Sequence, residues 1–175
     1  TPTASITNND GTTELTCSQT SISLTASGGS SYSWSGSLGS SANASATAAG
    51  TYTVTVTDGN GCTDTESITL TQDASVPSAS ITNNTGTSEL TCNTTSISVT
   101  ASGGASYSWS NSLGSNASAT ISSAGTYTVT ATAANGCTDT ESITITSNTT
   151  APTASITNND GTTELTCSQT SVSLT

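Results

Sequence analysis

Apolar residues alternate with hydroxyl-bearing residues along much of this chain, and that alternation predicts β-strands. The clearest case is the segment 51–57, where Tyr52, Val54 and Val56 fall on one side and four threonines fall on the other. Because successive side chains of a strand point to opposite faces, this segment predicts a strand with one buried face.

Six further short strands are predicted in the first 75 residues from the same alternation and from the turn residues between segments. They are Ala4–Thr7, Glu14–Cys17, Ser21–Ala26, Tyr32–Ser35, Ala44–Thr47 and Cys62–Thr71. Asn- and Gly-rich turns such as Asn8-Asn9-Asp10-Gly11 punctuate them. Seven short strands at this spacing predict an all-β fold of the immunoglobulin-like sandwich type.

The whole pattern repeats with a period of 75 residues. The segments 1–75 and 76–150 align without a gap and are identical at 52 of 75 positions, and 151–175 differs from the start of the first copy at 2 of 25. A period of this length suits one small domain per repeat. We therefore expect two tandem immunoglobulin-like β-sandwich domains and the incomplete start of a third, cut from a longer natural protein.

Composition narrows the classes of partner. The chain has 42 Thr and 35 Ser among 175 residues, no Lys, Arg or His, and a formal net charge of −11. Nucleic-acid binding uses cationic side chains to displace phosphate counterions, and an acidic chain is repelled by anionic lipid surfaces. We expect no nucleic acid partner and no membrane insertion, since no stretch approaches the ~20 apolar residues that span a bilayer.

The cysteines also follow the repeat. Cys17 precedes Cys62 by 45 residues, and Cys92 precedes Cys137 by the same interval. The economical prediction is one disulfide per repeat, Cys17–Cys62 and Cys92–Cys137, with the partner of Cys167 outside the chain; five buried thiols are the alternative. Closing such a loop is worth ~4 kcal/mol to a domain with few core residues, and it indicates an oxidising, extracellular location.

The joint pattern of Cys17, Tyr32-Ser33-Trp34-Ser35 and the segment 49–63 resembles SprB-type and related immunoglobulin- or PKD-like tandem repeats. Those repeats belong to very large cell-surface adhesins of Bacteroidota. The resemblance implies a secreted surface array and implies little about a ligand. The second copy departs from the pattern, because Ala133 stands where the first copy has Asp58.

Candidate catalytic and metal-binding chemistry is sparse. Without His or Lys, no Ser has a neighbouring base to activate it, so we expect no enzyme. Glu14, Asp64 and Glu66 are the candidate metal ligands, because Ca²⁺ favours several carboxylate oxygens. The alternative is a solvated acidic edge on the outer face of a strand; no other cofactor is expected.

The aromatic residues could either fill the core or bind sugars at the surface. Trp34 and Trp109 are interpreted as core residues and not as carbohydrate-stacking platforms. Tyr52 and Tyr127 are candidates for a tyrosine-corner hydrogen bond.

The Asn-x-Ser/Thr pattern marks candidate sites of N-linked glycosylation. These sites are Asn43, Asn83, Asn93, Asn116 and Asn148. Sugar O-linked to the exposed Ser and Thr is the favoured form.

Together these features predict a structural repeat array of a secreted cell-surface or extracellular filament protein. In this hypothesis the domains extend a rigid, glycosylated fibre or stalk, and neighbouring repeats are the partners through self-association. The alternative is a multivalent adhesin that binds glycans or surfaces through loops such as 36–48, with avidity supplied by repetition.

Overall fold

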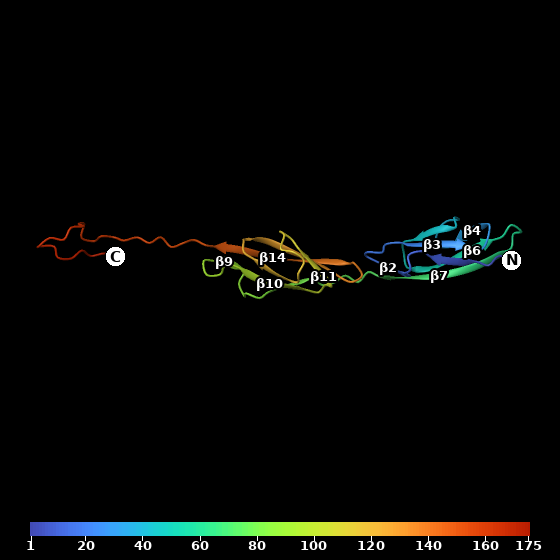
Figure 1. Cartoon of the computed structure of the whole chain (residues 1–175), viewed down its shortest axis with the longest axis horizontal. Coiled ribbons are helices and arrows are strands. Elements are labelled where there is room, and N and C mark those ends of the chain that lie inside the picture. The colour runs from blue at the N-terminus through green and yellow to red at the C-terminus, as the bar shows by residue number, and fades with distance from the viewer.

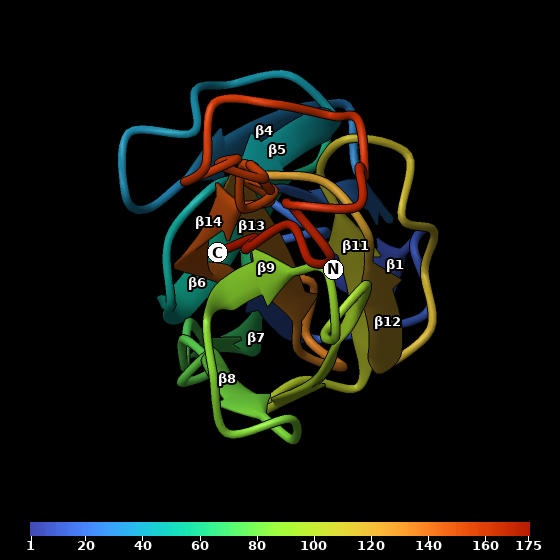
Figure 2. The ribbon, with the colours of Figure 1, turned by 90° about the vertical axis from the view of Figure 1, so that its left-hand side faces the viewer.

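The chain folds as two β-sandwiches placed end to end along one long axis (Figure 1). The computed structural model describes all residues from 1 to 175. Viewed along that axis, the second sandwich lies in front of the first (Figure 2). The structure contains no helix that is long and apolar enough to cross a membrane.

Each sandwich has seven strands. In the first they are β1 (Ser5–Asn8), β2 (Glu14–Thr16), β3 (Ile22–Ser27), β4 (Ser31–Trp34), β5 (Asn43–Ala46), β6 (Gly50–Thr57) and β7 (Thr63–Asp73). In the second they are β8 (Ser80–Asn83), β9 (Glu89–Thr91), β10 (Ile97–Ser102), β11 (Ser106–Trp109), β12 (Ser118–Ile121), β13 (Gly125–Thr132) and β14 (Thr138–Asn148). All seven strands predicted for the first copy are present, with ends that differ from the prediction by at most two residues.

Two sheets pack face to face in each sandwich. One sheet has the order β1-β3-β5 and is antiparallel, and the other has the order β2-β7-β6-β4. The short β2 is the exception to antiparallel pairing, because it runs parallel to the end of β7, with Glu14 opposite Thr71 and Thr16 opposite Asp73. The second sandwich repeats this arrangement with β8 to β14. This strand order confirms the predicted all-β, immunoglobulin-like fold.

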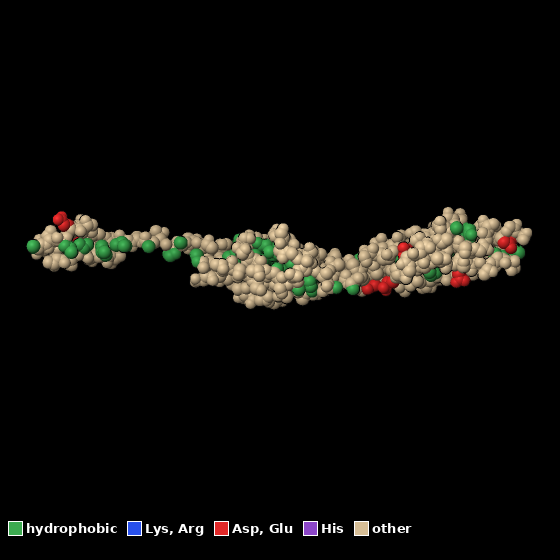
Figure 3. All heavy atoms as spheres, in the orientation of Figure 1, with side chains coloured by type: hydrophobic (Ala, Val, Ile, Leu, Met, Phe, Trp, Pro, Cys, Tyr) green, Lys and Arg blue, Asp and Glu red, His purple; other side chains and the backbone are tan.

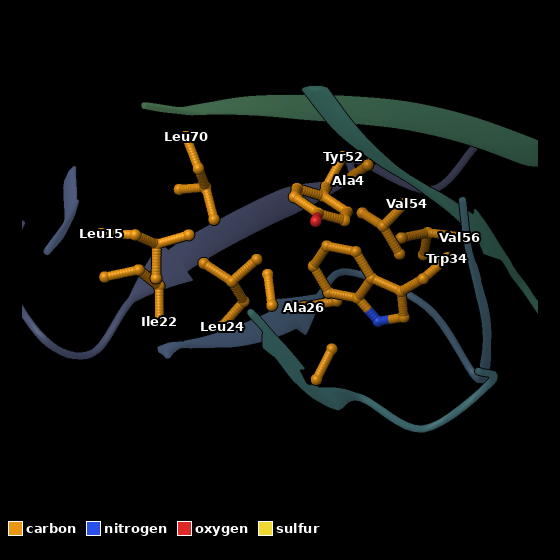
Figure 4. Close-up of a cluster of buried hydrophobic side chains, with 12 residues drawn as sticks. Ala4, Leu15, Ile22, Leu24, Ala26, Trp34, Tyr52, Val54, Val56 and Leu70 are labelled. Atoms are coloured by element: carbon orange, nitrogen blue, oxygen red, sulfur yellow. The ribbon is translucent and has the colours of Figure 1, made fainter. Parts of the chain in front are cut away.

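The core of the first sandwich lies between its two sheets (Figure 4). Ile22, Leu24, Val54 and Val56 are completely buried, as the alternation along their strands predicted. Trp34 is also buried, and its indole Nε1 donates to a backbone carbonyl at 3.0 Å. A buried indole with a satisfied N–H is a core residue, so the interpretation of the tryptophans as core is confirmed.

The two predicted tyrosine corners are present. The hydroxyl of Tyr52 donates to the carbonyl oxygen of Ala48 at 2.9 Å, and Tyr127 does the same to Ser123 at 2.9 Å. Each bond joins the first part of the long strand to the loop four residues upstream, so it fixes how the chain enters that strand.

Pairs of hydroxyl groups join neighbouring strands on the outer faces. Thr51 and Thr69 have Oγ1 atoms 2.9 Å apart, and Thr53 lies 2.8 Å from the Oγ of Ser67. The second sandwich repeats these pairs between β13 and β14. Cross-strand hydroxyl pairs of this kind each contribute a fraction of a kcal/mol to a sheet. The Ser- and Thr-rich composition thus supplies cross-strand contacts that charged pairs supply in other proteins.

The segment 149–175 extends away from the second sandwich (Figure 1). Its pairing amounts to one isolated bridge, Asn158 to Leu174. Leu174 corresponds to the buried Leu24 of the first copy, yet 58% of its surface is exposed. The same sequence pattern therefore buries its apolar side chains where the later strands of a repeat are present to pack against them.

This difference provides a matched pair of substitutions. Leu24→Ala should lower the free energy of unfolding by about 3 kcal/mol, because it leaves a cavity in a fully packed core. Leu174→Ala should leave it unchanged, since that side chain has no core to leave. Urea unfolding followed by tryptophan fluorescence measures both, and equal losses for the two variants would contradict this account.

A cross-linked joint as the candidate functional site

A disulfide bond joins the two sandwiches. It links Cys17, which follows β2 in the first sandwich, to Cys137, which closes the turn between β13 and β14 in the second. The two Cα atoms are 4.9 Å apart, although the residues are 120 positions apart in sequence. The predicted pairs Cys17–Cys62 and Cys92–Cys137 are therefore wrong, and the cross-link runs between repeats.

The strand pairing explains why a bond within one repeat cannot form. Cys17 lies beside the end of β7, because β2 runs parallel to that end. Cys62 lies just before the start of the same strand. At ~3.3 Å per residue, the length of β7 separates the two cysteines by roughly 35 Å. Disulfides need Cα atoms within about 7 Å, so Cys17 is available only to the neighbouring sandwich.

Hydrogen bonds from one asparagine reinforce the joint. The Nδ2 of Asn135 donates to the carbonyl oxygen of Ser75 at 3.0 Å and to that of Asp73 at 3.5 Å, so it holds the linker between the sandwiches. The carbonyl oxygen of Asn135 accepts from the backbone N–H of Ser18 at 3.4 Å. Its Oδ1 accepts from the N–H of Cys137 at 3.0 Å, which shapes the turn that carries the cysteine.

The turn of the second sandwich packs closely against the first. A Cβ atom added to Gly136, which has a φ of 80°, would lie 2.7 Å from the Cβ of Ser18. That contact leaves no space for a side chain, so glycine is required both by the backbone conformation and by the approach of the first sandwich. As a result only 2% of the surface of Cys137 is exposed.

Asp73, the last residue of β7, lies at the same joint. A side-chain hydrogen bond with Ser75 lowers the pKa of the Asp73 carboxyl below its ordinary value, and hydrogen bonds with the Ser75 backbone and the Asn135 side chain act in the same direction. The Ser75 N–H donates to its Oδ1 at 3.0 Å. These hydrogen bonds therefore stabilise the charged form of the Asp73 carboxylate.

The remaining three cysteines are free and exposed. They are Cys62, Cys92 and Cys167. Cys62 lies in the turn before the start of β7, whereas the joint lies beside the end of that strand. Cys92 follows β9, which pairs with the end of β14, whereas Cys137 lies just before the start of β14. A partner for Cys167 outside the chain stays a prediction.

The three candidate metal ligands are not brought together. Glu14 lies beside the end of β7, opposite Thr71, whereas Asp64 and Glu66 lie near its start. No group of three or more His, Cys, Asp or Glu side chains is placed to hold a metal ion. The proposed grouping of Glu14 with Asp64 and Glu66 is therefore wrong.

Asp64 has a structural contact instead. It lies opposite the buried Val56 in the pairing of β6 with β7, so it points to the core side of the sheet and not to the solvent side as expected. Its Oδ2 accepts from the backbone N–H of Ala4 at 2.8 Å, and Asp139 makes the same bond to Ala79 at 2.9 Å. The acidic side chain thereby ties the chain before β1 to β7.

The sequon asparagines lie at the surface. Asn83 is half-buried and its Nδ2 donates to a backbone carbonyl at 2.8 Å, while the other four are exposed. On the face drawn in Figure 3 the surface is mostly backbone and uncharged polar side chains, with scattered hydrophobic and acidic side chains, and the chain has no basic ones. Glycosylation at these positions stays a prediction.

Comparison with known proteins adds one distant structural likeness. No protein-family model matches the sequence, and no curated protein sequence matches it. The chain is similar to a solved structure of fibronectin(III)-like modules of CbhA from Clostridium thermocellum, with 14% identity and a TM-score of 0.36, over 82% of this chain and 95% of that one. With so low a TM-score the likeness carries no argument, and the fold assignment rests on the strand order.

The inter-repeat bond predicts a specific digestion product. Cleavage after glutamate under non-reducing conditions produces the peptides 15–66 and 90–141, each with two of the cysteines. A Cys17–Cys137 bond should hold these two peptides together as one species that separates on reduction. Bonds within each repeat would instead give two separate, internally looped peptides. Mass spectrometry before and after reduction distinguishes the two pairings.

Proposed function

We propose that this chain is part of a structural repeat array that extends a rigid stalk or filament outside the cell. The observation that supports the proposal most directly is the disulfide between Cys17 and Cys137, because it binds successive sandwiches covalently at their joint. Such a bond fixes one sandwich relative to the next and restricts their independent motion, as a stiff array requires.

The bond also changes how the chain bears tension. When the two ends are pulled, force passes from residue 17 directly to residue 137 through the sulfur atoms. The 119 residues between them lie outside the covalent path of the force. Only the arms 1–17 and 137–175 can then be drawn out, to a contour of roughly 190 Å, compared with roughly 600 Å for the whole chain.

The linker supports a stiff arrangement as well. Six residues, 74–79, separate β7 from β8, and they include Pro77, whose ring fixes one backbone torsion. Asn135 of the second sandwich donates to the carbonyl of Ser75 in this segment and to that of Asp73 just before it. A short, hydrogen-bonded linker beside a covalent cross-link leaves few ways for the two sandwiches to bend against each other.

An extracellular setting accords with the same bond. Disulfides persist in oxidising compartments and are rare in the reducing cytosol. The surface is rich in hydroxyl groups and lacks cationic side chains, and the resemblance to tandem surface repeats of Bacteroidota points in the same direction. We therefore propose that the array lies on a bacterial cell surface or in a secreted fibre.

Single-molecule stretching between the termini tests the load-bearing role. In oxidising buffer the extension should stop at roughly 190 Å, because the disulfide excludes 18–136 from the stretched path. Adding a reductant should release roughly 400 Å of further length. Cys17→Ser should give the long extension without reductant, whereas Cys62→Ser, which removes an exposed free thiol, should behave as the unaltered chain.

Two results would contradict the proposal. Full extension of the unaltered chain in oxidising buffer would show that the cross-link does not carry the force. A gain on reduction of two equal steps, each of roughly 150 Å, would show instead that the bonds close loops within single repeats.

We propose in addition that sugar is O-linked to hydroxyls in the loops. Ser37, Ser40 and Ser41 are exposed in the loop between β4 and β5. The hydroxyls of Thr53 and Ser67 are instead engaged with each other across strands, so modification there would break a contact that stabilises the sheet.

Peptide mass spectrometry of the protein from its natural source tests this distribution. Peptides that cover 36–42 should carry added sugar mass, and the paired hydroxyls of β6 and β7 should be bare. Unmodified loop peptides throughout would remove the glycosylation from the proposal.

A further inference from the structure

The turns that precede β7 and β14 have the same backbone but differ at their first residue. Residues 58–62 and 133–137 each have two backbone hydrogen bonds across the turn, 2.8 to 3.1 Å long. Their glycines also have nearly the same φ, 84° in the first turn and 80° in the second. The first residue is Asp58 in one turn and Ala133 in the other. This difference matters because the second turn forms the joint.

The Asp58 carboxylate bonds the N–H groups of its own turn. Its Oδ1 accepts from the N–H of Asn60 at 2.9 Å and from that of Cys62 at 3.0 Å. Aspartate commonly closes a turn in this way, by accepting from the backbone a few residues ahead. In a turn that begins with aspartate, the N–H of the cysteine is therefore already occupied.

Ala133 leaves the corresponding N–H free, and Asn135 uses it. The Oδ1 of Asn135 accepts from the N–H of Cys137 at 3.0 Å. Its Nδ2 donates on the other side to the carbonyls of Asp73 and Ser75 in the first sandwich. An amide group has its acceptor and its donors on opposite sides, so these bonds fix its orientation from both directions.

The first sandwich presents oxygen acceptors to this amide. The Asn135 side chain hydrogen-bonds the Asp73 carboxylate as well, and this bond contributes to the lowered pKa of that carboxyl. The same carboxylate accepts from the N–H of Ser75 at 3.0 Å. Turning the amide over would place its Oδ1 against a carboxylate and two carbonyl oxygens. The joint therefore requires the orientation that the Cys137 N–H maintains.

An aspartate at position 133 would disturb the joint in two ways. With the same turn backbone, its Oδ1 would accept from the N–H of Cys137, as Asp58 does in the first turn, and would displace the oxygen of Asn135. It would also bring a second carboxylate close to that of Asp73. The chain has no Lys, Arg or His to offset either charge.

The linker position differs between the copies in the same sense as the turn. Asp73 corresponds to Asn148, which is uncharged. The first copy thus has aspartate at both positions, Asp58 and Asp73, and the second copy has an uncharged residue at both. At the joint, the acidic linker of the first copy meets the uncharged turn of the second. The two like charges are in this way kept apart.

We propose that residues 73 and 133 are a matched pair that determines which repeat can follow which. The end of the sandwich that carries Asp73 accepts a turn that begins with a small uncharged residue, and it rejects an aspartate turn such as that of the first copy. The partner that this surface fits is a repeat of the second type. Copies that are identical at 52 of 75 positions can keep a fixed order by this selection.

This inference goes beyond the proposed function, because it concerns which turn the joint accepts and not the load that the joint bears. Stretching reports on the path of the force, whereas the exchange experiment below reports on the fit of the turn. A cross-link that carries force but forms equally well with aspartate at position 133 would leave the first proposal intact and overturn this one.

The test uses the full chain with serine in place of the three free cysteines, so that only Cys17 and Cys137 remain. Equilibration with reduced and oxidised dithiothreitol, followed by alkylation of free thiols and mass measurement, gives the equilibrium constant for closing the disulfide. Ala133→Asp should lower this constant about tenfold, because the Asn135 amide loses the N–H that orients it and a second charge approaches Asp73. The turn itself should still form, since Asp58 occupies this position in the first copy.

The second copy supplies the compensating substitution. Asp73→Asn introduces the residue that stands at position 148, removes one of the two charges and adds an amide donor beside Asn135. The chain with both Ala133→Asp and Asp73→Asn should therefore close the disulfide within about threefold of Asp73→Asn alone. Ala134→Asp is the matched control, because it adds the same charge to the exposed neighbouring residue of the same turn. It should change the constant by less than about threefold.

Three results would overturn the proposal. An unchanged constant for Ala133→Asp would show that the joint does not discriminate at this position. Equal losses for Ala133→Asp and Ala134→Asp would show a general effect of charge and not the selection of one residue. Losses that simply add when Ala133→Asp is combined with Asp73→Asn would show that the two positions are not matched to each other.

Discussion

The parallel pairing of β2 with the end of β7 sets the direction in which the cysteines can bond. It holds Cys17 at the end of the sandwich that faces the next repeat, while β7 carries the chain back from Cys62 at the other end. The length of β7 thus separates Cys17 from Cys62, although both belong to the same repeat. The disulfide, the buried turn and the position of the linker all follow from this three-residue pairing.

Hydrogen bonds of hydroxyl and backbone groups, and not ion pairs, make up the polar contacts of this structure. With no Lys, Arg or His, the chain has no side-chain cation to pair with its carboxylates. Hydroxyl pairs take that place on the outer faces, and Asp64 and Asp139 accept from backbone N–H groups. Contacts of hydroxyl and backbone groups depend less on salt concentration than ion pairs do, which suits a surface exposed to changing surroundings.

The sequence predicted the local structure well and the long-range contacts less well. Alternation placed all seven strands of a repeat, and it identified Val54, Val56 and Trp34 as core residues. It did not reveal which end of β7 lies beside β2, because a three-residue strand carries too little pattern to show its partner or its direction. The economical pairing of Cys17 with Cys62 failed for that reason.

The same limitation affected the acidic residues. Asp64 and Glu66 were correctly expected to share one face of a strand, but that face is the inner one, since Ile68 and Leu70 belong to it. The available signal was that Asp64, Glu66, Ile68 and Leu70 occupy every second position of one strand, and so share one face. Applying it through to the apolar end of the strand would have placed both carboxylates at the edge of the core.

A sequence separation of 120 between bonded cysteines has a consequence for the survival of the chain under proteolysis. Residues 17 to 137 and their sulfur bridge form a closed covalent ring, and the two arms leave it at the two bonded cysteines, whose Cα atoms are 4.9 Å apart. A protease that cuts any exposed loop within the ring opens it without detaching one arm from the other. Loss of continuity requires a cut in an arm, or reduction together with a cut, so a single cut between residues 17 and 137 leaves the chain covalently continuous.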